Sequence, residues 1–232
     1  MSAAPAQPTS KGLIRSLVGI RGYLSVVVVA VHLAPFAIAL VPLTAPFFLP
    51  VWHHAYVALD LFFVLSGFVI TAGYRGVFAR WPVWGAFGKF LWARLSRFYP
   101  VHLAVLAVLV GAVLGARAIG REIPHGGDLG VDLLRQLTLT SGWGGADALT
   151  WNGPVWSLSA EWFAYLAFPA YAALALRLRA RPWVLIALAM LFFVALDAFY
   201  RAWFGRMLPR AEDSLGILRI IPEFLYGIGL YY

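Results

Sequence analysis

Arg21 and His32 lie in one strongly apolar stretch, IRGYLSVVVVAVHL, which runs over residues 20–33. An ionisable side chain inside such a helix costs about 3 kcal/mol on insertion scales and commonly serves a function. Eleven positions turn an α-helix through three turns and about 20°, so both side chains share one face, about 16 Å apart along the axis. Desolvation favours a neutral imidazole, which could act as a general base. The alternative is structural: His32 bonds a neighbouring helix and Arg21 extends to lipid headgroups.

Two carboxylates interrupt other apolar stretches. Asp60 lies in VALDLFFVLSGFVIT, where it could orient a catalytic histidine, pair with an arginine or cap the helix. In the same stretch, Ser66 and Gly67 predict close helix packing. Glu161 lies in WNGPVWSLSAEWFAYLAFP, about two turns after the expected start of a helix. A carboxylate at that depth needs a partner, so it could bond a substrate hydroxyl or hold Trp156 and the preceding loop in place.

An arginine pair lies in the basic and aromatic segment FLWARLSRFYP. Arg94 and Arg97 occupy positions i and i+3 of an expected helix. Two guanidinium groups on one side suit a phosphate-bearing ligand, because arginine binds phosphate oxygens in a bidentate manner. The alternatives are a solvated topology signal and the binding of lipid headgroups. The histidines show no spacing typical of a metal cluster, so no metal site is predicted.

The composition is that of a polytopic membrane protein. Of 232 residues, 62% are hydrophobic and 12% are charged, and the mean hydropathy is +0.81. Soluble domains carry about 25% charged residues. The apolar runs are long and continuous, which favours membrane-spanning helices over a β-barrel. At about 20 residues per crossing, the chain allows about six helices, and the predicted fold class is an all-α transmembrane helix bundle.

Six apolar segments are expected to form the helices of this bundle. Their approximate ranges are 17–41, 55–73, 101–116, 154–176, 183–200 and from 216 onward. A basic aromatic segment at 74–100 is expected to lie in the membrane interface. The longest loop is expected at 117–152, and residues 1–12 are expected to form a disordered tail.

The charge distribution predicts the topology. The formal net charge is +8 and the pI is about 10.1, which we attribute to basic residues that fix the orientation of the helices. If the N-terminus is cytoplasmic, eleven Lys and Arg residues fall on the cytoplasmic side and six on the outer side, while Arg219 lies in or beside the last helix. The excess predicts a cytoplasmic N-terminus. The chain has no Cys, which excludes disulfides and thiolate chemistry.

Four segments in this order resemble the acyltransferase family 3 of integral-membrane O-acyltransferases. They are IRGYLSVVVVAVHL, VALDLFFVLSGFVIT, FLWARLSRFYPVHL and NGPVWSLSAEWFAYLAFP, with PEFLYGIGL as a weaker match. The resemblance implies a membrane-embedded domain over residues 13–232 in an inner (cytoplasmic) membrane. It implies transfer of an acyl group, commonly acetyl, from cytoplasmic acyl-CoA to a hydroxyl of a carbohydrate or glycan. Family members usually have more membrane helices, so further C-terminal helices are expected beyond this sequence.

The resemblance also assigns roles to individual residues. Arg21 and His32 match the family's arginine–histidine pair, and His32 is expected to act as base or acyl carrier. The expected catalytic residues are His32, Asp60 and Glu161. The residues expected to bind the acyl-CoA phosphates are Arg21, Arg94 and Arg97. The residues expected to bind the acceptor are Asn152, Trp156, Ser157 and Ser159. No permanently bound cofactor and no nucleic-acid partner are expected.

Two other function classes remain open from the residues alone. A proton-coupled transporter could use His32 and Asp60 as a relay, and its transport would not depend on acyl-CoA. A non-catalytic membrane scaffold would tolerate His32→Ala and would bind no acyl-CoA.

Overall fold

A computed structural model describes residues 10–78, 84–121, 128–144, 151–212 and 215–232. Every regular element in this part of the chain is helical, which confirms the predicted all-α fold class. The six predicted helices are present as α1 (Ser10–Leu40), α3 (Tyr56–Phe78), α4 (Trp84–Ala118), α6 (Val155–Leu178), α7 (Pro182–Phe204) and α8 (Ile217–Tyr231). The predicted tail lies outside the described residues up to position 9, and α1 already begins at Ser10.

Within the described residues, four helices are long and apolar enough to cross a membrane. The apolar spans are Gly19–Leu40 in α1, Tyr56–Val77 in α3, Gly85–Ala118 in α4 and Pro182–Phe204 in α7. Large apolar side chains lie exposed along α1 and α4, which suits contact with lipid. These spans indicate a multi-pass membrane protein.

Helix α4 differs from the prediction of an interfacial helix followed by a separate span. It runs without a break from Trp84 to Ala118 and contains Pro100. Proline removes one backbone hydrogen bond inside a helix but is tolerated in membrane helices, where local adjustments satisfy the freed carbonyl. The proline therefore did not mark a helix end.

Two short helices were not predicted. Helix α2 (Ala45–His54) follows a 3₁₀ turn, η1 (Pro42–Thr44), and has proline in its first turn, where the missing N–H costs nothing. Helix α5 (Leu129–Leu137) lies within the predicted loop. Asp128 caps it by accepting the N–H groups of Gly130 at 2.7 Å and Val131 at 3.1 Å.

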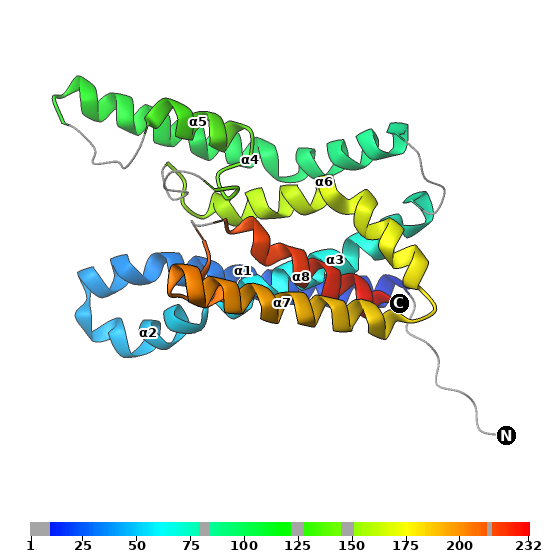
Figure 1. Cartoon of the computed structure of the whole chain (residues 1–232). Coiled ribbons are helices and arrows are strands. Elements are labelled where there is room, and N and C mark those ends of the chain that lie inside the picture. Colours follow the sequence, from blue (N-terminus) through cyan, green and yellow to red (C-terminus); the bar gives the residue numbers. More distant parts are fainter. Residues whose placement is uncertain (1–9, 79–83, 122–127, 145–150, 213–214) are drawn as a thin grey trace.

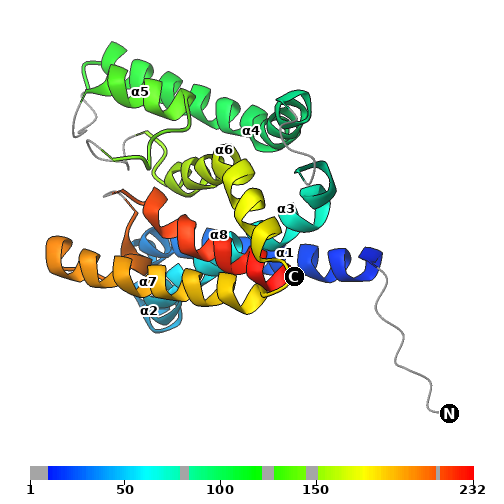
Figure 2. The same cartoon turned by 45° about the vertical axis from the view of Figure 1, so that its right-hand side comes forward.

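The helices form a layered bundle (Figure 1). Helices α4 and α5 lie along one side, and α6 lies between them and the layer that holds α1, α3, α7 and α8. The turned view shows the same order of helices (Figure 2). Helix α8 contacts α3, α6 and α7, so it is the central element.

Two glycines allow α3 and α8 to touch through their backbones. A Cβ atom on Gly67 would collide with the carbonyl of Phe224, and one on Gly227 would collide with the carbonyl of Val64. Small residues at such a crossing permit close approach of membrane helices. The predicted close packing at Ser66 and Gly67 is confirmed.

An aromatic cluster fixes α6 between its neighbours. Phe168 on α6 lies 5.4 Å from Phe90 on α4 and 6.2 Å from Phe224 on α8, measured between ring centroids. All three rings are almost fully buried. These contacts hold the helix that carries Trp156 and Glu161.

Candidate active site

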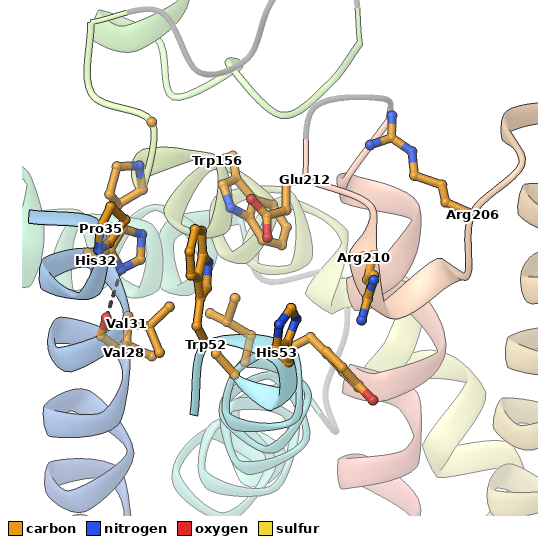
Figure 3. Close-up of a pocket in the computed structure, with 15 residues that line it drawn as sticks. Val28, Val31, His32, Pro35, Trp52, His53, Trp156, Arg206, Arg210 and Glu212 are labelled. Atoms are coloured by element: carbon orange, nitrogen blue, oxygen red, sulfur yellow. Dashed lines mark hydrogen bonds between the residues drawn. The ribbon is translucent and has the colours of Figure 1, made fainter. Parts of the chain in front are cut away.

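A cavity of about 730 Å³ opens where α1, α2 and the first turns of α3 and α6 meet the segment before α8 (Figure 3). Its volume lies within the range of small-molecule sites, about 300–1,000 Å³. The walls combine the apolar side chains of Val28, Val31 and Leu59 with aromatic rings. The polar groups on the wall are those of His32, His53, Arg206, Arg210 and Glu212.

His32 faces this cavity, and one hydrogen bond determines the tautomer of its neutral ring. Its Nδ1 lies 2.7 Å from the carbonyl oxygen of Val28, one turn earlier in α1. A carbonyl only accepts, so Nδ1 carries the hydrogen and donates it. In the neutral ring, Nε2 is then the unprotonated nitrogen, with a lone pair available to take a proton.

Trp156 forms another part of the wall, and a buried arginine lies behind it. The guanidinium carbon of Arg219 lies 5.6 Å from the centroid of the Trp156 ring, and Phe63 packs against the same ring at 6.2 Å. Trp156 is 3% exposed. The predicted acceptor-binding residue therefore lies at the cavity, held by a cation–π contact and an edge-to-face contact.

Asp60 pairs with Arg219, which is one of the three roles considered for it. Arg219 Nε donates to Asp60 Oδ1 at 2.8 Å, Nη2 donates to the same oxygen, and Nη2 also donates to the Tyr56 carbonyl at 2.7 Å. Glu223, one turn further along α8, lies 3.4 Å from Arg219 Nε. The cluster joins the start of α3 to α8 just beneath the cavity.

Glu161 lies in a second cluster. It accepts a hydrogen bond from the fully buried hydroxyl of Ser66, and its Oε1 lies 3.6 Å from Arg21 Nη2. The Arg21 guanidinium also lies over the ring of Phe62, at 5.7 Å. This cluster ties α1 to α3 and α6. Among the described residues, no hydrogen bond joins His32 to Asp60 or Glu161, so the three predicted catalytic residues lie in three separate environments.

The arginine pair lies toward the other end of α3. Arg94 Nη2 donates to the Tyr74 hydroxyl at 2.9 Å, and its guanidinium lies over the Tyr74 ring at 5.0 Å. Arg97 is exposed. Tyr56 lines the cavity, and eighteen residues of helix separate it from Tyr74, which corresponds to about 27 Å along the axis.

The other predicted acceptor-binding residues bind the protein itself. The hydroxyl of Ser157 donates to the Pro154 carbonyl at 2.9 Å, and that of Ser159 accepts the Gly142 N–H at 3.1 Å. The carbonyl of Asn152 accepts the N–H of Val155 at 3.1 Å. They shape the loop that presents Gly153 and Pro154 to the cavity rather than lining it.

Sequence reasoning missed several residues of the site. Trp52, Tyr56 and Arg210 line the cavity, and Arg219 supports it from behind. A lone arginine in an apolar helix such as Arg219 is itself a signal, because it requires a partner. The aromatic and basic cavity residues carried no comparable signal, because such residues are common at membrane interfaces.

Comparisons with known proteins identify the family of the chain. The Acyltransferase domain family matches residues 14–232. Acyltransferase MdmB of Streptomyces mycarofaciens is 28% identical over 156 residues, which are 66% of this chain and 38% of that protein. Protein 2 in the picA locus of Rhizobium radiobacter is 34% identical over 70 residues, 30% of this chain and 36% of that protein. The chain thus matches less than half the length of these relatives. No solved structure matches it.

Proposed function

Because the chain belongs to the Acyltransferase domain family, we propose that it moves an acyl group from acyl-CoA to a hydroxyl of a carbohydrate. The resemblance favours acetyl as this group. The observation that carries the proposal is the imidazole of His32. Its Nδ1–H is held by the Val28 carbonyl, which leaves Nε2 as a proton acceptor on the cavity wall. We place the protein in the inner membrane with a cytoplasmic N-terminus, following the excess of basic residues on that side.

In the proposed reaction, Nε2 of His32 takes the proton of the acceptor hydroxyl while the hydroxyl oxygen attacks the thioester carbonyl carbon. The new C–O bond forms, the C–S bond breaks, and the imidazolium returns the proton to the departing CoA thiolate. General-base catalysis of this kind contributes about 10²–10⁴-fold. The hydrogen bond to Val28 keeps the ring in the reactive tautomer and orientation.

The donor would enter from the end that carries Arg94 and Arg97. Guanidinium groups suit the phosphates of acyl-CoA, and the long, thin pantetheine arm would extend along α1 toward His32. Arg21 fits a positioning role better than phosphate binding, because Glu161 lies 3.6 Å from it and Phe62 lies beneath it. The Arg21–Glu161–Ser66 cluster would hold α1 in place, so that His32 keeps its position on the wall.

His32 could also act as an acyl carrier. Nε2 would then attack the thioester first, and the acceptor hydroxyl would displace the acyl group from the ring in a second step. Rapid quenching during turnover distinguishes the two routes, because only the second produces protein that carries labelled acyl group on a histidine.

The test uses purified protein with radiolabelled acetyl-CoA and follows CoA release and label transfer to a glycan fraction. We expect His32→Ala to lower the rate by about 10²–10⁴-fold. The double variant Arg94→Ala/Arg97→Ala should raise the KM for acetyl-CoA. His54→Ala is the matched control, since His54 Nδ1 donates to the Pro50 carbonyl at 2.8 Å in the same local geometry but does not line the cavity. Equal CoA release by wild type and His32→Ala would remove His32 from the chemistry and favour a proton relay.

A further inference from the structure

The cavity wall opposite His32 is basic. Figure 3 shows His32 and Pro35 on one side of the cavity and Arg206 and Arg210 on the other, with Trp52 and Trp156 between them. Both arginines and Glu212 come from the segment between α7 and α8. Of the two arginines, Arg210 is exposed, so its guanidinium is accessible on this side of the cavity.

Arg210 is the arginine on which the inference rests. Its guanidinium carbon lies 5.9 Å from the ring centroid of Tyr56, and both residues line the cavity. Within the described residues, no carboxylate lies within ion-pair distance of it. A guanidinium that lies against an aromatic ring and lacks a protein carboxylate can bind an anionic ligand.

The backbone that carries Arg210 is anchored, so the group has a defined position. Arg210 ends a 3₁₀ turn, η2 (Leu208–Arg210), whose first N–H donates to the Asp197 carboxylate at 2.8 Å. Leu208 and Ala211, on either side of the turn, are fully buried. Asp197 is itself held by Arg201 at 2.6 Å. The arginine is therefore presented from a packed turn rather than from a loose loop.

The cavity has His32 on one side and Arg210 on the other, so a single acceptor molecule could contact both. Aromatic side chains between polar groups are typical of sites that hold a ring and fix its orientation with a few polar contacts. A sugar ring over Trp52, whose side chain is exposed, would place a hydroxyl toward His32 and a substituent toward Arg210.

We propose that the acceptor is an acidic carbohydrate, in which a carboxylate or phosphate group is bound by Arg210 while a hydroxyl faces His32. The inference rests on the proposed function, because it identifies the cavity as the acceptor site. Glu212, on the same wall, could accept a hydrogen bond from a further hydroxyl.

Two readouts on the purified protein test the inference: thermal stabilisation by sugars, and CoA release from acetyl-CoA. The probes are glucose, glucuronate and glucose 1-phosphate, which share a ring and differ in charge. We expect the two anionic sugars to bind wild type at least about tenfold more tightly than glucose, the factor that one charge-assisted hydrogen bond supplies. Arg210→Gln should remove this difference, Arg210→Lys should keep part of it, and the control Arg121→Gln, an exposed arginine outside the cavity, should leave it unchanged.

The outcomes separate this inference from the proposed function. Equal affinity for glucose and glucuronate, or an anion preference that survives Arg210→Gln, would overturn the inference while CoA release could still support an acyltransferase. An anion preference that depends on Arg210, without CoA release from any acceptor, would uphold the site for an acidic sugar and reject the proposed reaction. A lipid headgroup carries the same chemistry, so phosphatidylglycerol in mixed micelles is a further arm. Stabilisation by that lipid alone, with none by the anionic sugars, would identify a lipid site and overturn the inference.

Discussion

Replacing Asp60 with Asn would leave the guanidinium of Arg219 buried without its main counter-charge. Arg219 is fully buried and gives Asp60 two hydrogen bonds, from Nε at 2.8 Å and from Nη2. Breaking a buried pair in this way costs about 3–5 kcal/mol. A change of 1 kcal/mol shifts the melting temperature of a chain of this size by about 2–4 °C, so we expect Asp60→Asn to lower it by about 6 °C or more. Fluorescence-detected size-exclusion chromatography after heating measures this shift.

Glu223→Gln is the matched control within the same cluster. Its carboxylate approaches Arg219 Nε only to 3.4 Å, and neither of its buried oxygens accepts a hydrogen bond. Glu223→Gln should therefore lower the melting temperature much less than Asp60→Asn. The triple variant Asp60→Leu/Arg219→Leu/Glu223→Leu removes all three charged groups of the cluster and should recover most of the stability. If Glu223→Gln destabilised the protein as much as Asp60→Asn, the assignment of Asp60 as the main counter-ion would be wrong.

Two further perturbations test the packing and the capping. Gly227→Val should prevent folding, because its Cβ would collide with the carbonyl of Val64. Gly111→Ala on α4 is the control, since its Cβ meets no neighbouring atom and the substitution should be neutral. The yield of monodisperse protein distinguishes the two variants. The N–H group of Val131, and to a smaller extent that of Gly130, lowers the pKa of Asp128. The cap therefore stabilises α5 fully above the unfolded-state pKa near 3.9. This stabilisation is lost as the pH falls through the lower folded-state pKa. Hydrogen exchange of the Val131 amide should accelerate, relative to Asp128→Asn, only below about pH 4.

The long apolar runs were enough to predict the six main helices, because a membrane span has to satisfy its backbone within one continuous segment. The same reasoning ended a helix near Pro100 and overlooked α2, since proline is compatible with both a helix and a break. In these cases the tertiary contacts of the neighbouring helices decide the outcome.

The partners of the charged residues were harder to predict than the charged residues themselves. Asp60 and Glu161 are conspicuous in apolar stretches, and each requires a partner. Asp60 pairs with Arg219, 159 positions away, and Ser66 with Glu161, 95 positions away. The sequence alone does not indicate which arginine each carboxylate contacts. The structure places His32 on the cavity wall, Asp60 beside Arg219 and Glu161 beside Arg21, and the catalytic roles of all three stay predictions.

The positions of the paired and unpaired arginines suggest where the two proposed substrates, both anionic, would bind. Arg21 and Arg219, within the bundle, lie beside carboxylates, whereas among the described residues Arg97 and Arg210, toward opposite ends, lie beside none. Phosphates of the donor at one end and an acidic acceptor at the other would use these exposed charges, and the uncharged thioester arm would pass between them. Added salt screens exposed charges far more than buried pairs. Raising the ionic strength should therefore increase the KM of both acetyl-CoA and glucuronate while kcat stays constant, and glucose should show only the donor effect. A fall in kcat with unchanged KM values would place the salt-sensitive charges at the reaction centre and contradict this division.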